Sequence, residues 1–225
     1  MSISRATAFA FSTSFSDVEL SKDSFVAAPR VFAQKPLYRL IFVGGLSQLY
    51  KAPDVLLDAV AECLGNRCRL DLAIAGSGQY QHSLALRAES LGISNRVKFL
   101  GQLTTPEAVR QALDEADLFV LPSRQEGLPR AMIEAMARAL PCIGSTVGGI
   151  PELLPASDLV PPNDPQALSK RIGEVLADPT RMNFMSARNL QKAREFLHTP
   201  EQRRQAFYRH VRTETEQWLA RKSTS

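Results

Sequence analysis

From residue 39 onward, the chain repeats one unit: a short apolar run, a glycine or proline, and then a helical segment. The first run is RLIFVG (39–44), and its helix is PDVLLDAVAECLG (53–65), which begins with proline and ends with glycine. Further runs lie at 69–76, 96–101, 117–122, 141–145 and 157–162, and helices are expected over 82–92, 106–116, 129–139, 165–179 and about 180–220. This alternation is typical of a parallel sheet with helices on both faces.

We therefore predict an α/β fold with a single doubly wound Rossmann-like parallel sheet over residues 39–178. Residues 1–38 are interpreted as a leader or linker, in which a strand and a disordered segment both stay open. Residues 179–225 are expected to form C-terminal helices. Ligands of such sheets bind beyond the carboxyl ends of the strands, so the loops at 44–51, 76–79, 101–105, 122–129 and 145–149 are the candidate site.

The composition is that of an ordinary soluble globular protein, with 44% hydrophobic and 22% charged residues. No apolar run approaches the ~20 residues that span a bilayer, and the first residues do not resemble a secretory signal. The three cysteines have no metal-binding spacing and there are three histidines, so we expect reduced thiols, no metal site and a cytoplasmic location.

The net charge of +4 is unevenly distributed, because basic residues outnumber acidic ones about two to one between Lys170 and Lys222. This segment could contact anionic lipid at the inner face of a membrane, although a solvated helix face is the favoured interpretation. Few aromatic residues separate the charges, which argues against a nucleic-acid partner.

Two glutamates bracket the start of the helix expected over 129–139. Glu126 lies in the preceding loop and Glu134 in the second turn of the helix. The free N–H groups there form an anion site, and Gly127 allows close backbone approach. By spacing alone, however, an ordinary helix charge and a surface glutamate are the favoured interpretation.

The surrounding motifs change this interpretation. Glu126 and Glu134 with the following Ala-Met-Ala resemble the Glu-x7-Glu signature of the retaining family four (group one) glycosyltransferases. The turn from Ser145 through Gly148-Gly149 to Pro151-Glu152 matches as well. So do LPSRQEG (121–127), FVGGLSQLYKAPDVLLDA (42–59), LAIAGSG (72–78) and RVKFLGQL (96–103). The resemblance runs from about residue 39 to 176.

The resemblance implies that this chain is the C-terminal, donor-binding half of a two-domain GT-B architecture, with a role in polysaccharide biosynthesis. Lys51 then matches the lysine that neutralises the donor diphosphate, Glu126 the glutamate at the transferred sugar, and Glu134 the one that binds the ribose. Further donor-binding positions are Gly44, Gly45, Ser123, Gly127, Leu128 and Gly101. The nucleotide-sugar is a substrate, and neither a cofactor nor a metal is expected.

Three positions depart from the family pattern. Gly45 stands where the family usually has an arginine on the diphosphate, so one cation is missing. Arg124 or Arg130 could replace it, but a surface role is favoured for each. Ala52 replaces a glycine after Lys51, and the family's Gly-Phe-Gly after Glu126 is Gly-Leu-Pro.

The length is the larger departure, because the family usually carries a second Rossmann-like domain before this one. The residues before position 39 are too few to form it. We therefore predict a glycosyltransferase of the hexosyltransferase type that needs an acceptor domain from elsewhere. The alternative is a non-catalytic nucleotide-sugar-binding or interaction module left by truncation. An NAD-dependent reductase lacks its glycine fingerprint.

Overall fold

A computed structural model describes residues 20–223, and the prediction for residues 1–19 lies outside them. Residues 20–194 form one compact unit, and residues 195–223 belong to a second. The first unit contains the whole sheet together with residues 20–37, which the sequence assigned to a linker.

The sheet has six parallel strands in the order β3-β2-β1-β4-β5-β6. The strands are β1 (Tyr38–Val43), β2 (Leu70–Ala75), β3 (Val97–Gly101), β4 (Leu118–Leu121), β5 (Cys142–Ser145) and β6 (Leu159–Val160). Their long apolar runs follow from burial on both faces, as in β1, where Leu40, Ile41 and Phe42 are fully buried. The predicted doubly wound α/β fold is confirmed, and the five long predicted strands agree with the structure to within a residue or two.

The helices are α1 (Pro53–Gly65), α2 (Gln81–Ser90), α3 (Pro106–Asp114), α4 (Arg130–Ala137), α5 (Ile150–Leu153), α6 (Pro165–Leu176) and α7 (Pro179–Ser223), with 3-10 turns at η1 (Lys22–Ser24), η2 (Ser94–Arg96) and η3 (Ala156–Asp158). Their first turns carry the expected start signals. Proline opens α1, α3 and α6, and the side chains of Thr105 and Asp164 accept hydrogen bonds from the N–H groups of Ala108 and Ala167.

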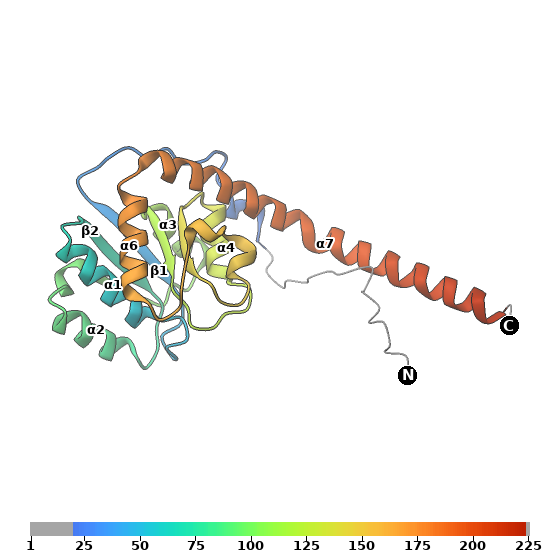
Figure 1. The fold of residues 1–225 in the computed structure, drawn as a ribbon, viewed down its shortest axis with the longest axis horizontal. Coiled ribbons are helices and arrows are strands. Elements are labelled where there is room, and N and C mark those ends of the chain that lie inside the picture. Colours follow the sequence, from blue (N-terminus) through green and yellow to red (C-terminus); the bar gives the residue numbers. More distant parts are fainter. Residues whose placement is uncertain (1–19, 224–225) are drawn as a thin grey trace, which may run out of the picture. The chain divides into compact units, whose positions relative to one another are not determined.

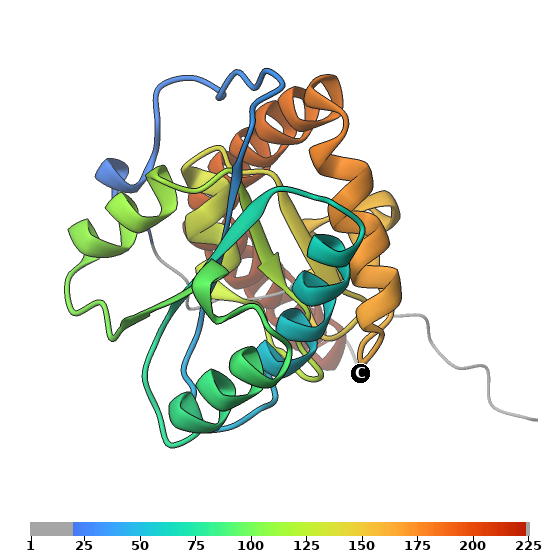
Figure 2. The ribbon, with the colours of Figure 1, turned by 90° about the vertical axis from the view of Figure 1, so that its left-hand side faces the viewer.

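The helices form a layer on each face of the sheet (Figures 1 and 2). Helices α1 and α6 pack together on one face, and α3 and α4 cover the other. This arrangement follows from right-handed crossovers, because the connections from β1 to β3 and those from β3 to β5 run in opposite directions along the sheet.

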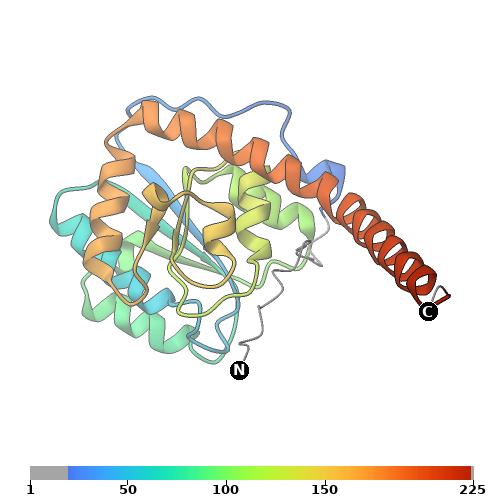
Figure 3. The same ribbon diagram turned by 45° about the vertical axis from the view of Figure 1, so that its right-hand side comes forward.

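Residues 20–37 run beside residues 179–194 of α7, which belong to the same unit (Figure 3). The backbone N–H groups of Arg30 and Phe32 donate to the side chains of Ser186 and Asn183 at 2.8 and 2.6 Å. The Arg30 guanidinium donates to the carbonyls of Ala116 and Arg138 at 2.8 and 2.7 Å. This segment is therefore tied to the sheet unit by polar contacts that its weak apolar pattern did not predict.

The C-terminal range holds one continuous helix, α7, where the sequence predicted several helical segments. The segment contains no glycine and many residues with high helix propensity, and the helix continues through Pro200. Arg209 and Arg212 are exposed, and Arg212 pairs with Glu216 at 2.9 Å. None of the described helices is long and apolar enough to cross a membrane.

Candidate functional site

The strand order reverses between β1 and β4, which are neighbours at the centre of the sheet. The chain leaves β1 towards β2 on one side and leaves β4 towards β5 on the other. The loops that follow these two strands, 44–52 and 122–129, therefore meet at the carboxyl edge, where doubly wound sheets bind ligands. Both loops were singled out from the sequence.

Lys51 and Glu126 meet at this edge although they are 75 residues apart. The Lys51 Nζ donates to Glu126 Oε1 at 2.6 Å, and the Ser123 Oγ donates to the same oxygen at 2.9 Å. The side chains of Lys51 and Glu126 are 15% and 7% exposed. The Tyr50 ring lies 5.4 Å from the lysine nitrogen. Removing either partner of this buried pair would leave the charge of the other without compensation.

Glycines allow the backbones around this pair to approach closely. A Cβ on Gly44 would lie 2.5 Å from the Lys51 Cδ, so the lysine stem passes directly over this position. Gly148 has a φ of 53°, and a Cβ there would lie 1.9 Å from the Glu126 carbonyl oxygen. The next residue, Gly149, donates its N–H to the Gly127 carbonyl at 2.8 Å. The turn at 145–149 thus supports the loop that holds Glu126.

Helix α4 begins beside Glu126 with unused backbone donors. Pro129 is its N-cap and supplies no side-chain cap. Within the described residues, the N–H groups of Gly127, Leu128, Arg130 and Ala131 have no hydrogen-bond acceptor. Such groups, with the positive end of the helix dipole, favour an anion.

Glu134 lies one turn further along α4. Its carboxylate pairs with the Arg130 Nε at 2.9 Å, and the two side chains are 24% and 63% exposed. Arg130 therefore has a carboxylate partner, as expected of a surface residue. The structure records no contact that joins Glu134 to the Lys51–Glu126 pair.

Arg124 clamps the two loops together, a role that the sequence did not reveal. Its guanidinium donates to both oxygens of Asp54, at 2.8 and 2.7 Å, and to the Leu49 carbonyl at 2.7 Å. Its backbone N–H donates to the Tyr50 carbonyl at 2.6 Å. The arginine is neutralised by Asp54, so it does not replace the cation missing at Gly45. Asp54 and Arg124 are 70 residues apart, so no local sequence pattern predicts that they pair.

The contact with Arg124 changes the pKa of the Asp54 carboxylate. Burial raises the pKa of Asp54, but the hydrogen bonds and charge of Arg124, with nearby backbone N–H groups, outweigh burial and hold the pKa below its ordinary value. Hydrogen bonding to Asp54 raises the pKa of Arg124 in turn. Asp54 lies in the first turn of α1, where a carboxylate is also favoured by the helix dipole.

The remaining predicted glycines lie near a pocket of about 150 Å³ beyond the ends of β1, β2 and β3. Gly44, Gly45 and Gln102 line it. Gly101 has a φ of 69° and accepts the Gly76 N–H at 2.8 Å. Gly45 has no atom within 4 Å of where a Cβ would stand, so a side chain there would enter open space.

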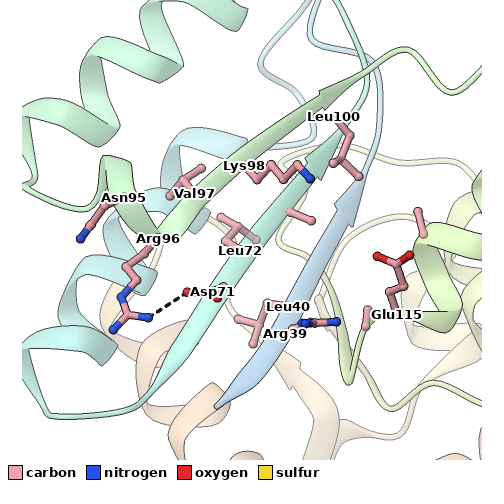
Figure 4. Close-up of a pocket in the computed structure, with 13 residues that line it drawn as sticks. Arg39, Leu40, Asp71, Leu72, Asn95, Arg96, Val97, Lys98, Leu100 and Glu115 are labelled. Carbon is pink, nitrogen blue, oxygen red and sulfur yellow. Dashed lines mark hydrogen bonds and ion pairs between the residues drawn. The ribbon is translucent and has the colours of Figure 1, made fainter.

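Two larger pockets lie towards the amino ends of the strands, away from the Lys51–Glu126 pair. Figure 4 shows one of them, which has a volume of about 390 Å³ and is lined by residues that include Arg39, Lys98 and Glu115. Arg96 pairs with Asp71 beside it. The second has about 300 Å³. Among the described residues, no group of three or more histidine, cysteine or acidic side chains could hold a metal ion. The absence of a metal requirement stays a prediction.

A family model described as "Glycosyl transferases group 1" matches residues 38–178, which confirms the resemblance found in the motifs. The GDP-mannose-dependent monoacylated alpha-(1-6)-phosphatidylinositol monomannoside mannosyltransferase of Corynebacterium glutamicum is 36% identical over 146 residues. The match covers 61% of this chain and 38% of that enzyme. The chain thus spans about a third of the length of curated relatives of this kind.

Solved structures share the fold. Anabaena HepE, determined in complex with UDP-glucose, has a TM-score of 0.68 at 22% identity, over 77% of this chain and 49% of that one. The C-terminal domain of the group 1 glycosyl transferase LpcC from Francisella tularensis has a TM-score of 0.64 at 17% identity, over 70% of this chain and 85% of that domain. The sheet unit therefore has the fold of a glycosyltransferase domain.

Proposed function

We propose, because this chain belongs to the group 1 glycosyl transferases, that it holds a nucleoside diphosphate-sugar at the carboxyl edge of its sheet. Sugar transfer from a nucleotide-sugar is the reaction of the family. The chain spans 38% of the mannosyltransferase it matches, so the activity of a whole enzyme is proposed here and not inferred from the match.

The observation that carries the proposal is the meeting of Lys51, Glu126 and Ser123 where the strand order reverses. A lysine beside unused N–H donors at the start of α4 is suited to a diphosphate, which gains negative charge as the sugar departs. Glu126 remains beside it as an acceptor for a sugar hydroxyl. The site thus offers a cation, Lys51, for the diphosphate of a nucleotide-sugar and an anion, Glu126, for a hydroxyl of its sugar.

We assign roles in that complex as follows. Lys51 moves its ammonium contact from Glu126 to the diphosphate and stabilises the leaving group. Glu126 positions the sugar, and Glu134 exchanges Arg130 for the ribose diol. Ser123 orients Glu126 through its hydroxyl. The backbone approaches the donor closely at Gly44, Gly127 and Leu128. The nucleotide lies beside Gly45 and Gly101.

Transfer with retention proceeds, in this proposal, on one face of the sugar. The bond from the anomeric carbon to the diphosphate oxygen breaks, and the acceptor oxygen bonds to the same face of that carbon. The acceptor proton passes to the departing phosphate. Lys51 and the helix N–H groups act on the charge of that phosphate, while Glu126 forms no covalent bond.

The relatives support a nucleotide-sugar as the donor, but they do not define its nucleobase. The mannosyltransferase is named as GDP-mannose-dependent, and HepE was solved with UDP-glucose. The common chemistry is a nucleoside diphosphate bonded to a hexose. The acceptor is bound by a second domain or subunit, and the basic face of α7 that includes Arg209 and Arg212 is proposed to contact anionic lipid.

Calorimetry with the 225-residue chain tests the donor site. UDP or GDP should bind with a Kd of roughly 10 μM to 1 mM, and the weak end corresponds to about −4 kcal/mol. Lys51→Ala should weaken the nucleoside diphosphate and inorganic pyrophosphate alike, because both carry the diphosphate. Glu134→Ala should weaken only the nucleoside diphosphate, which alone has a ribose.

Lys98→Ala is the matched control, because this exposed lysine lies at the other end of β3 and should affect neither ligand. Equal losses for both ligands in Glu134→Ala would remove the ribose role. Undiminished binding in Lys51→Ala would remove the diphosphate role.

The second candidate is a non-catalytic nucleotide-sugar-binding module. Gly45 favours it, because the position that usually supplies a second cation to the diphosphate is empty space here. Such a module would bind the nucleoside diphosphate and the intact nucleotide-sugar with similar affinity and would never cleave the sugar, even with an acceptor domain present.

A further inference from the structure

The residue that follows Lys51 has a strained backbone. Ala52 has a φ of 53°, in the left-handed region, where the Cβ of an L-residue comes too close to the next carbonyl oxygen. It is fully buried, and it replaces the glycine of the family motif, which would adopt this φ freely. Such a conformation persists only where the surrounding contacts hold it.

Two carbonyls of the turn 49–52 are bound from the loop after β4. The Leu49 carbonyl accepts the N–H of Ala52 at 3.0 Å and the Arg124 Nη1 at 2.7 Å. The Tyr50 carbonyl accepts the backbone N–H groups of Arg124 and of the next residue at 2.6 and 3.3 Å. Arg124 therefore bonds to this turn twice, through its side chain and through its backbone.

The Arg124 guanidinium is itself fixed from further sides. It donates to both oxygens of Asp54 in the first turn of α1, and its Nε donates to the Asn163 Oδ1 at 2.6 Å. Asn163 belongs to the segment between β6 and α6 and has a φ of 59°. Together with the bond to Leu49, four hydrogen bonds hold one planar group, and arginine is the side chain that supplies such a fork of donors.

These anchors flank the proposed catalytic pair in both loops. Lys51 follows Tyr50 directly, and Glu126 lies two residues after Arg124. In the donor complex proposed above, the Lys51 ammonium leaves Glu126 for the diphosphate. The ion pair then no longer places the lysine, and its position depends on the backbone of the turn.

We propose that Arg124 is a positioning residue of the donor site: it holds the strained turn 49–52 so that Lys51 reaches the diphosphate. Arg124 contacts neither the donor nor the acceptor, and it acts through the lysine. This role rests on the proposed function, because it requires a diphosphate at Lys51. A purely structural clamp would lower the stability of the chain but leave the diphosphate affinity of the folded chain unchanged.

Titration with inorganic pyrophosphate, followed by NMR of the 225-residue chain, measures the role of Arg124. Arg124→Gln should weaken pyrophosphate binding about tenfold, because a displaced lysine loses a charge-assisted hydrogen bond to the phosphate. Arg124→Lys should not restore the affinity, because an ammonium is a point charge that cannot bond to Leu49, Asp54 and Asn163 together. Unchanged affinity in folded Arg124→Gln would overturn the proposal.

Arg87→Gln is the matched control. Arg87 donates to both oxygens of Asp58 at 2.9 and 2.6 Å, and Asp58 lies one helical turn after Asp54 in α1. This variant removes a similar bidentate pair from the same helix, at a distance from the turn that carries the lysine, and should keep the pyrophosphate affinity. An equal loss in Arg87→Gln would show that any weakening of α1 has this effect, which would contradict a specific role of Arg124.

The coupling to Lys51 separates a positioning residue from a structural one. In the Lys51→Ala chain, Arg124→Gln should cause no further loss of pyrophosphate affinity, because the group through which it acts is gone. Losses that multiply would mean that Arg124 acts independently of the lysine, against the proposal. Undiminished binding in Lys51→Ala alone would instead refute the donor site itself, so the two failures are distinguishable.

Two further variants test how Arg124 holds the turn. Asn163→Gly removes one of the four bonds and suits the φ of 59°, so it should weaken pyrophosphate binding about two- to threefold even if Arg124→Gln fails to fold. Ala52→Gly removes the strain, so it should restore part of the affinity lost in the Arg124→Gln chain. Circular dichroism checks that each variant is folded at the temperature of the titration. Full affinity in Asn163→Gly, or no recovery from Ala52→Gly, would contradict the hold on the turn.

Discussion

At the residue scale, Gly45 lies in open space beside the proposed diphosphate position. It has no positive φ, and no atom within 4 Å would obstruct a side chain. An arginine there should add a charge-assisted hydrogen bond to the diphosphate. Gly45→Arg should therefore tighten nucleoside diphosphate binding about tenfold, which equals about 1.4 kcal/mol.

Gly65→Arg is the control for this gain, because Gly65 also has open space but lies at the end of α1. Calorimetry on both variants gives the comparison. A gain shared by the two would reflect net charge alone, and no gain in Gly45→Arg would show that the diphosphate does not lie beside this loop.

A second prediction for a single residue concerns the backbone conformation of Gly148. Alanine would have a φ of 53° and a Cβ at 1.9 Å from the Glu126 carbonyl oxygen. The left-handed conformation alone costs about 1–2 kcal/mol, and the clash forces the loop around Glu126 to move. Gly148→Ala should thus lower the free energy of unfolding by at least ~2 kcal/mol and weaken donor binding.

Chemical denaturation provides the measurement, and Gly65→Ala is the matched control. Gly65 has open space and lies in a helix, where alanine should stabilise the chain by up to about 1 kcal/mol. If Gly148→Ala kept both stability and binding, the turn at 145–149 would not support Glu126.

At the scale of elements, the Arg124–Asp54 pair joins the loop after β4 to the first turn of α1. The pKa of Asp54 is lowered in the folded chain, so its contribution to stability is complete above the unfolded pKa of about 3.9. That contribution is lost as the pH falls through the lower folded value.

We expect Asp54→Asn to lower the free energy of unfolding at pH 7 and to have a smaller effect below about pH 4. Unfolding curves from pH 7 to pH 3 measure the difference. The double variant with Arg124→Gln should show no further pH dependence from this pair. A deficit that stays constant with pH would mean that Asp54 acts through packing and not through its charge.

At the level of the whole molecule, the sheet unit carries the residues proposed to bind the donor, and the described residues contain no second Rossmann-like sheet. Transfer needs the acceptor oxygen within about 3–3.5 Å of the reacting carbon, and this positioning can lower the barrier by ~7–11 kcal/mol. Assayed alone with nucleotide-sugars, the 225-residue chain should hydrolyse them slowly without efficient transfer.

Adding a partner acceptor domain should raise the rate, and Glu126→Ala or Lys51→Ala should abolish that increase. Product analysis by mass spectrometry distinguishes hydrolysis from transfer. Efficient transfer by the chain alone would contradict the need for a partner. Transfer that neither substitution affects would contradict the catalytic roles of both residues.

Local sequence patterns predicted the helices and strands and identified the loops at the carboxyl edge of the sheet. Apolar runs such as 39–44 and proline or glycine at helix ends are local signals, because they follow from burial and backbone geometry within a few residues. The motif around Glu126 and Glu134 likewise lies within one segment, so it could be recognised before the fold was known.

The contacts between side chains far apart in the sequence became known from the folded structure. The family motifs placed Lys51 and Glu126 at one cleft but did not predict their direct ion pair. The Arg124–Asp54 clamp and the contact of Arg30 with the Arg138 carbonyl join residues 70 and 108 positions apart. Such contacts depend on β1 lying next to β4 and on the packing of the helices over them. Local periodicity carries no record of that order, because each strand satisfies its own pattern beside any parallel neighbour.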